Sequence, residues 1–308
     1  MKYAINFLKN YISNILFLFF IAAFSFFTYQ NKSDLNNLFE FNLFNLSLLV
    51  VLYALSYLAK AKMNQHLYST KDISMSFIEA LRLIINSTAG NLSTPFSLGT
   101  GYKFHYLKKN YKLDYAEHLN INIYYTLFTN LIYVLLLMTI SLLNYQNGNQ
   151  EFFNFTFIWL LIFIIGLYIF FILSKEIKTK NLNFLNRYSL RSLTLSFSKI
   201  MKLFVYTSLI ITINVLSHLY LFGLLGLEIT TSQIIAYACL SGLANIIKFT
   251  PGNFGINESA LILSNLYHGL GPLEIIISSL IFRFFSWLNI LLYYGLLNFK
   301  KFNNTKNE

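Results

Sequence analysis

The sequence predicts an all-α integral membrane protein with about six transmembrane helices and two re-entrant helical hairpins in an inverted repeat. Three observations lead to this fold class. Hydrophobic residues make up 56% of the 308 residues and charged residues only 11%, against roughly 25% charged in a soluble domain. Several apolar runs reach the ~20 residues that a helix needs to cross a bilayer. Two further apolar regions are interrupted by the same short motif.

Six apolar segments are long enough to span roughly 30 Å of hydrocarbon. We expect crossings at 11–29, 43–60, 118–144, 155–174, 203–225 and 272–298. The first segment contains the faint cleavage pattern Ala23-Phe24-Ser25, but its apolar run continues through Phe26 and Phe27. We therefore expect a retained anchor rather than a cleaved signal peptide. The polar segments are all short, which leaves no room for a separate soluble catalytic domain.

The net charge of +11 is carried by alternate loops. The basic set comprises both chain ends and the loops at 60–72, 103–117 and 175–202, the last of which holds seven bases and one acid. The positive-inside rule assigns this set, and with it both termini, to the cytoplasm. Attraction to anionic lipids is a second interpretation of the 175–202 loop. Because the bases flank membrane segments, the charge does not indicate nucleic-acid binding.

The interrupted regions, 73–107 and 232–268, share the pattern Thr-Pro-x-x-x-Gly. It reads Thr94-Pro95-Phe96-Ser97-Leu98-Gly99 in the first and Thr250-Pro251-Gly252-Asn253-Phe254-Gly255 in the second. Each copy lies between two crossings, which gives units at about 43–144 and 203–298. By the charge count the first crossings of the two units run in opposite directions. We therefore expect an inverted repeat within one membrane domain, 1–308, an arrangement typical of transport sites at the bilayer midplane.

Each interrupted region has both flanks on one side of the membrane by the charge count. The returning arms, 101–109 and 256–268, extend about 14 Å and 20 Å as helices, which is too short to cross. We therefore expect two re-entrant hairpins whose tips meet in the bilayer centre. Proline disfavours helix in the residue before it, so Thr94 and Thr250 should end the inbound arms. The glycines that follow should permit the turns.

Charged residues gather at the second tip. Lys248 precedes the turn, Glu258 begins the outbound arm, and Arg283 lies in the middle of the last crossing. Ions inside a membrane are usually paired or functional, so we expect a Glu258–Arg283 ion pair, which either handles a headgroup or only holds the hairpin to the bundle. Lys248 and the outbound helix ends favour an anion such as phosphate. The candidate path comprises Thr94, Pro95, Gly99, Lys248, Thr250, Pro251, Gly252, Asn253, Gly255, Asn257, Glu258 and Arg283.

We expect structural roles for the remaining polar residues. Glu79 and Arg82 are three apart on one helical face and should pair locally. Asp114 and Glu117 should be solvated, and we expect no catalytic residue, metal or cofactor. One cysteine, Cys239, excludes an internal disulfide framework. The histidines lack metal-ligand spacing and are expected at the membrane interfaces: His66, His105, His118, His218 and His268.

The second hairpin resembles a known family at residue level. The stretch 251–258, Pro-Gly-Asn-Phe-Gly-Ile-Asn-Glu, followed by Arg283, is similar to the Pro-Gly-Gly-x-Gly-x-x-Glu and downstream Arg pattern of the lysylphosphatidylglycerol synthase transmembrane region, a flippase-like domain. The resemblance extends in segment order over most of the chain. Asn253 replaces the usual glycine, Asn257 stands where a basic residue is frequent, and Thr100 stands where the first hairpin commonly has Glu.

The resemblance implies lipid translocation, or a helper role in lipid or glycan-lipid modification, with any aminoacyl transfer belonging to a separate soluble domain. We therefore expect a stand-alone flippase-like protein of the cell membrane that moves a phospholipid or polyprenyl-linked lipid between leaflets and is not itself an enzyme. The alternatives are a secondary transporter of a small polar solute and a non-transporting accessory subunit of an envelope-lipid enzyme. Membrane lipids are the expected partners, with a second copy of the chain or an envelope-lipid enzyme as further candidates.

Overall fold

The computed structural model describes residues 43–94, 98–145, 197–245 and 250–304, with a few further positions between 154 and 164. Every regular element in these four ranges is helical, which confirms the all-α fold class. The crossing predicted at 11–29, most of the one at 155–174, and both chain ends lie outside the described residues, as do Pro95 and Lys248 of the candidate path.

Four long helices form the frame of the molecule. They are α3 (Leu43–Ser69), α6 (Tyr115–Tyr145), α9 (Phe197–Leu224) and α13 (Pro272–Asn304). Each contains an apolar stretch of 26 to 29 residues, which extends about 39 Å or more and is enough to cross a bilayer. These helices confirm four of the six predicted membrane segments.

Helix α3 is longer than the sequence analysis predicted. It continues to Ser69, nine residues beyond the expected end at residue 60. The extra stretch contains no glycine or proline that would stop a helix. The chain turns only afterwards, through Asp72 with its left-handed φ of 58°. Lys60 and Lys62, which were counted as loop charges, therefore lie inside the helix.

The first interrupted region forms a helical hairpin of α4 (Phe77–Ser93) and α5 (Leu98–Tyr111). Ser76 begins α4 by accepting a hydrogen bond from the Glu79 amide, and Thr94 ends it in an extended conformation. The prediction that Thr94 marks the end of the inbound arm is therefore confirmed. With 17 and 14 residues, the two arms extend about 25 Å and 21 Å, too short to cross a bilayer.

The second interrupted region contains α10 (Thr231–Ala244), the short turn η3 (Pro251–Asn253), α11 (Ile256–Leu263) and α12 (Asn265–His268). A capping box between Thr230 and Gln233 begins α10. The inbound arm ends at Ala244, so the prediction that it reaches Thr250 is wrong. Thr250 instead precedes the η3 turn. None of these three helices is long enough to cross a bilayer alone.

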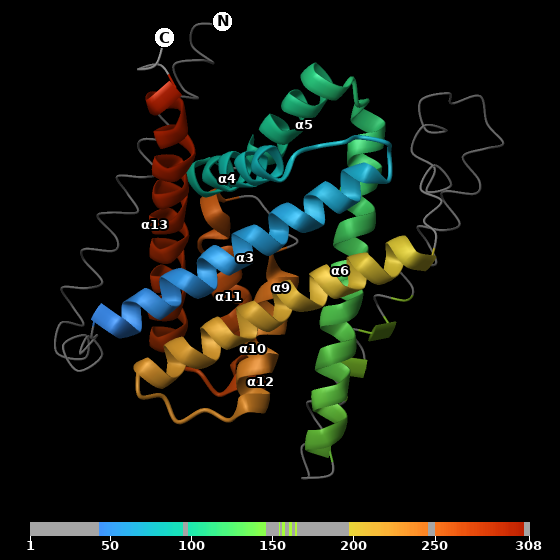
Figure 1. Cartoon of the computed structure of the whole chain (residues 1–308). Coiled ribbons are helices and arrows are strands. Elements are labelled where there is room, and N and C mark those ends of the chain that lie inside the picture. The colour runs from blue at the N-terminus through green and yellow to red at the C-terminus, as the bar shows by residue number, and fades with distance from the viewer. Residues whose placement is uncertain are drawn as a thin grey trace, which may run out of the picture.

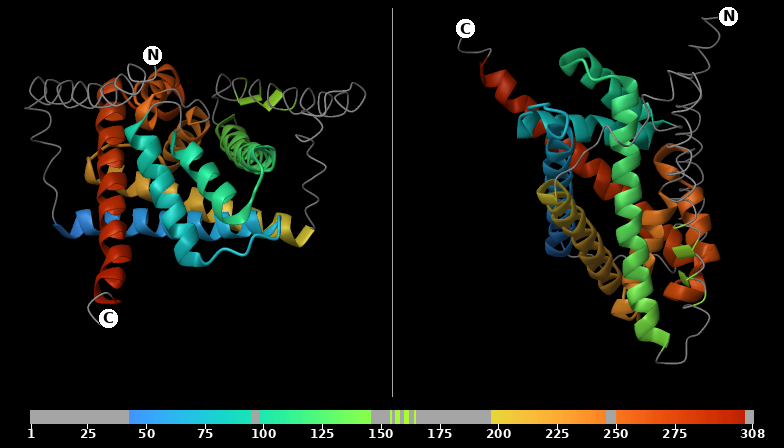
Figure 2. Two further views of the ribbon diagram at one scale, coloured as in Figure 1. Left: turned by 90° about the horizontal axis from the view of Figure 1, so that it is seen from above. Right: turned by 90° about the vertical axis from the view of Figure 1, so that its right-hand side faces the viewer.

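The hairpins pack against the frame helices, α4 on α3 and α10 on α6 and α9. Helices α3 and α9 pack side by side and cross obliquely between α13 on one flank and α6 on the other (Figures 1 and 2). The α4–α5 hairpin lies towards one end of the bundle and α10–α12 towards the other (Figure 1). The turn η3 packs on α4. The hairpins therefore approach each other from opposite ends, as the re-entrant prediction requires.

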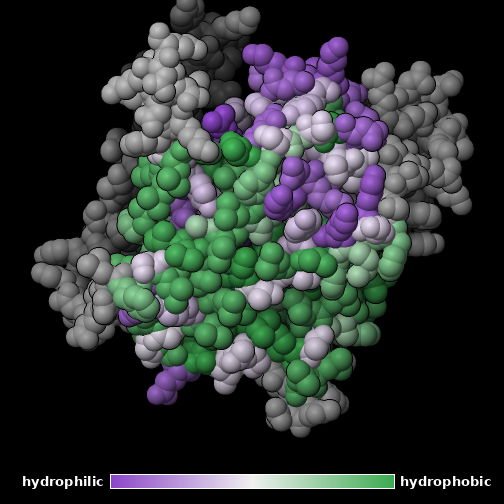
Figure 3. Space-filling view, in the orientation of Figure 1, coloured by the Kyte–Doolittle hydropathy of each residue, from purple (hydrophilic) through white to green (hydrophobic). Residues whose placement is uncertain are grey.

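The outer surface of the frame is apolar. A broad hydrophobic band covers α3 and α9, while polar surface gathers over α5 and the adjacent end of α3 (Figure 3). Large apolar side chains are exposed on all four long helices, among them Val51, Leu135, Val205 and Leu291. Hydrocarbon is the environment that accepts such a surface. The chain is therefore an integral membrane protein.

Candidate functional site

The turn between α10 and α11 has an unusual backbone. Gly252, Asn253 and Gly255 all have left-handed φ values, of 56°, 58° and 82°. Glycine adopts this region without a steric cost, and asparagine tolerates it better than most residues. The Thr250 hydroxyl donates to the Phe254 carbonyl at 2.7 Å and closes the turn. The glycines of the motif thus permit the turn as predicted, and Asn253 keeps the shape where it replaces glycine.

Glu258 lies buried at the start of α11, 5% exposed. Its Oε2 accepts a hydrogen bond from the Gly255 amide at 2.6 Å, and its Oε1 pairs with Arg283 Nη1 at 2.7 Å. The Ser279 hydroxyl also donates to Oε1. The carboxylate thus caps the helix and is neutralised by the arginine. The predicted Glu258–Arg283 ion pair is confirmed.

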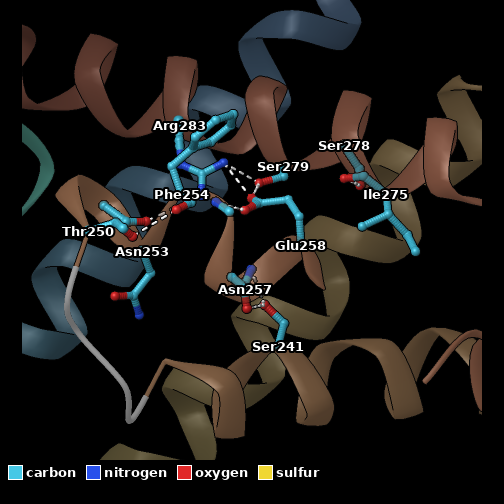
Figure 4. Close-up of polar contacts among 12 residues, drawn as sticks. Ser241, Thr250, Asn253, Phe254, Asn257, Glu258, Ile275, Ser278, Ser279 and Arg283 are labelled. Atoms are coloured by element: carbon cyan, nitrogen blue, oxygen red, sulfur yellow. Dashed lines mark hydrogen bonds and ion pairs between the residues drawn. The ribbon is translucent and has the colours of Figure 1, made fainter. Parts of the chain in front are cut away.

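Arg283 connects α13 to both sides of the turn (Figure 4). Besides the ion pair, its Nη2 donates to the Gly252 carbonyl at 3.2 Å, and its guanidinium carbon lies 4.9 Å from the centre of the Phe254 ring. A planar guanidinium can make these directional contacts together, whereas a lysine ammonium cannot. The pair therefore fixes the shape of the tip, and a direct role for it in handling a headgroup stays a prediction.

The two hairpin tips touch. A Cβ placed on Gly252 would lie 3.0 Å from Leu92 Cδ2 and 3.8 Å from Leu92 Cα, near the end of α4. Gly99 serves a purpose different from that of Gly255, because a Cβ there would lie 1.8 Å from the Ser87 carbonyl oxygen. The first glycine of the shared motif thus allows α5 to pack against the α4 backbone, while the second allows a left-handed turn.

A partly open cavity of about 810 Å³ adjoins the touching tips. It is bounded by both hairpins, by α6 and α9, and by Lys60 of α3. Hydroxyl and amide groups dominate the polar part of its lining. The lining amides are those of Asn91, Asn122, Asn130, Asn214, Asn245 and Asn253. Such groups can donate to and accept from a polar ligand without adding charge.

The candidate path divides into two groups around this cavity. Thr250, Gly252 and Asn253 line it, and Asn257 lies next to it through a contact with Ser241. Glu258 and Arg283 lie behind the turn and support it. Thr94, Gly99, Pro251 and Gly255 shape the two tips without lining the cavity.

The sequence analysis missed the polar face of α6. His118, Asn122, Thr126 and Asn130 follow one another at intervals of four residues and all line the cavity. Side chains four apart share one face of a helix, and a polar stripe within an apolar span indicates a buried polar neighbour. The stripe is visible in the sequence. Lys60 was missed for a different reason, because α3 was predicted to end there.

Two predictions about other polar residues are wrong. Glu79 does not pair with Arg82: its carboxylate accepts from the hydroxyls of Tyr106 and Tyr111 at 2.7 and 2.6 Å, and Arg82 donates to the Leu297 carbonyl. The histidines also depart from the expected interfacial positions: His118, His218 and His268 are buried in the bundle. Glu117 pairs with Lys71 at 3.4 Å while its own side chain stays 41% exposed, which agrees with the solvated position expected for it.

Comparison with protein-family models identifies the family to which the chain belongs. A model of the lysylphosphatidylglycerol synthase transmembrane region matches residues 11–293. The chain belongs to this family. Neither the curated proteins nor the solved structures gave a match. The matched range of the lysylphosphatidylglycerol synthase transmembrane region includes both hairpins, the cavity and the Glu258–Arg283 pair, so the whole candidate site lies within it.

Proposed function

We propose that the protein moves a lipid headgroup between the two leaflets through the cavity at the hairpin tips. The observation that carries the proposal is a cavity of about 810 Å³, lined by hydroxyl and amide groups as well as by apolar side chains, inside a frame of membrane-length apolar helices. A polar headgroup is costly to carry through hydrocarbon, and hydroxyl and amide side chains along its path reduce that cost. Backbone turns at membrane depth are tolerated where they line such a cavity.

The arrangement of the helices supports an inverted repeat as the basis of this movement. Units 43–144 and 203–298 each contain a long helix, a hairpin and a second long helix. The packing between the units is reciprocal: α6 of the first unit packs on α10, and α13 of the second packs on α4. In inverted repeats, alternate access to a central site arises when one unit rocks against the other.

The described part of the cavity lining contains no carboxylate, which favours a lipid over an ion-coupled solute. A secondary transporter driven by protons or sodium needs an acidic or carbonyl-rich site next to its substrate. Among the described residues that line the cavity, none is Asp or Glu. The accessory-subunit alternative differs in its outcome, because it predicts no lipid movement by the purified chain.

The charge distribution supports an orientation in the cell membrane with both termini cytoplasmic. Asn110, at the end of α5, should then face the cytoplasm, and Thr230, before α10, should face outwards; both are exposed. On a Cys239→Ser background, we expect a membrane-impermeant thiol reagent to label Thr230→Cys in intact cells and to label Asn110→Cys only after permeabilisation. Labelling of Asn110→Cys in intact cells would reverse the proposed orientation.

The proposed function is tested by leaflet exchange in vesicles that contain the purified protein. Fluorescent phosphatidylglycerol is placed in both leaflets, and an impermeant reductant bleaches only the outer one. We expect the protected inner pool to become accessible faster than in protein-free vesicles and in proportion to the protein content. An accessible fraction equal to that of protein-free vesicles would count against the proposal and in favour of the accessory role.

A further inference from the structure

Lys60 is the one basic side chain whose charge faces the described part of the cavity. It lies on α3 and lines the cavity together with both hairpin tips. His118, also in the lining, is engaged locally, because its Nε2 lies 2.8 Å from the Asn122 amide nitrogen and its Nδ1 lies 3.4 Å from the Tyr68 hydroxyl. No acidic side chain is found in the same described lining. Among the lining residues that the structure describes, Lys60 therefore supplies the ammonium charge.

The Lys60 ammonium has no anionic partner in the part of the chain that the structure describes. Its recorded contact is with the face of the Tyr57 ring, 5.4 Å from the ring centre. Neighbouring cations are better satisfied: Arg283 pairs with Glu258, and Lys103 donates to the Asn64 side chain. An ammonium in a membrane-embedded cavity is costly without a counter-charge, and a cation–π contact offsets only part of that cost.

Lys60 lies within α3, sixteen residues from Phe44 and nine from Ser69, so it is not a residue of a helix end. Its side chain lines the cavity together with residues of both hairpins and of α6. The cavity is therefore the place where its charge can meet a ligand.

From this geometry we propose that Lys60 binds the phosphate group of the ligand that enters the cavity, so that the substrate class is anionic, phosphate-bearing molecules. The proposal rests on the proposed function, which supplies the ligand's route through the cavity. The Lys60 ammonium, which has no anionic partner among the described residues, supplies the charge that binds the ligand. A lysine is a point charge that suits phosphate oxygens, and the surrounding amides can donate to the remaining oxygens. Two sources share this chemistry: a phospholipid headgroup and free phosphate.

The test compares Lys60→Met with Lys62→Met in the vesicle exchange measurement. Lys62 is a matched control because it lies on the same helix, is exposed, and lines a different pocket. The probes are fluorescent phosphatidylglycerol and an uncharged fluorescent glucosyl-diacylglycerol, which has no phosphate. We expect Lys60→Met to slow phosphatidylglycerol exchange by about tenfold or more, the scale of a lost hydrogen bond to a charged group. Exchange of the glucosyl lipid, and both rates in Lys62→Met, should stay unchanged.

The outcomes separate the inference from the proposed function. If the wild type moves both lipids and Lys60→Met leaves both rates unchanged, or slows both equally, the phosphate-binding role is wrong while the lipid path stands. Lys60→Arg should restore most of the phosphatidylglycerol rate, since it keeps the charge, and a failure to restore it would also count against a charge-based role.

Equilibrium binding of radiolabelled inorganic phosphate to the purified protein distinguishes the two sources. We expect phosphate to bind the wild type and Lys62→Met, and to bind Lys60→Met about tenfold more weakly, the scale of one charge-assisted contact. If this binding is seen although the wild type moves no lipid, free phosphate is the ligand and the lipid path is wrong. If Lys60→Met binds phosphate as the wild type does, the inference is overturned whether or not lipid moves.

Discussion

Replacement of Glu258 by Gln, or of Arg283 by Leu, is expected to lower the free energy of unfolding by about 3–5 kcal/mol, because either change leaves one buried charge without its partner. The effect should be large here for a structural reason. The Glu258 side chain is 6% exposed and that of Arg283 15%, so water cannot replace the missing partner. The measurement is unfolding by denaturant in a fixed detergent, followed by helical circular dichroism.

The double variant and a surface pair serve as controls for this prediction. Glu258→Gln combined with Arg283→Leu should recover much of the loss, since no unpaired charge then remains. Glu117→Gln removes a similar contact, with Lys71. It should cost less than about 1 kcal/mol, because the Glu117 side chain is 41% exposed. Strictly additive losses in the double variant would show that Glu258 and Arg283 are not coupled.

Most of the helical frame could be predicted from the sequence because hydrocarbon imposes a simple requirement on it. A stretch that crosses the bilayer must be apolar and about 20 residues long, and such stretches can be read directly. The Glu258–Arg283 pair could be predicted for a similar reason. Few charges are tolerated at that depth, so an acid and a base in adjoining segments have little choice of partner.

Helix ends and long-range partners could not be predicted in the same way. Proline indicates where a helix cannot continue, but not where it stops earlier, so the end of α10 at Ala244 was missed. Helix α3 passes Lys60 because a lysine does not stop a helix. Glu79 pairs with hydroxyls 27 and 32 residues away. Spacing within one helix says nothing about such partners, although it favoured Arg82.

The shared motif shows how the same residue can meet different physical demands. Thr-Pro-x-x-x-Gly predicted a break in both hairpins; α4 ends at the first copy, whereas α10 ends before the second copy, which forms the η3 turn. Gly255 is required by its left-handed φ of 82°, whereas Gly99 is required by the close approach of the Ser87 carbonyl. The sequence pattern is identical, and only the backbone geometry separates the two causes.

The central claim is that lipid passes through the cavity bounded by the hairpin tips and α6, and a block placed in that cavity tests it most directly. Thr126 lines the cavity, while Leu135 of the same helix is 50% exposed on the outer surface. Tryptophan places the same large side chain at either position, inside the cavity in one variant and on the outer surface in the other. We expect Thr126→Trp to reduce phosphatidylglycerol exchange to nearly the rate of protein-free vesicles, and Leu135→Trp to keep the wild-type rate. Wild-type exchange in a folded Thr126→Trp variant would contradict the cavity as the lipid path.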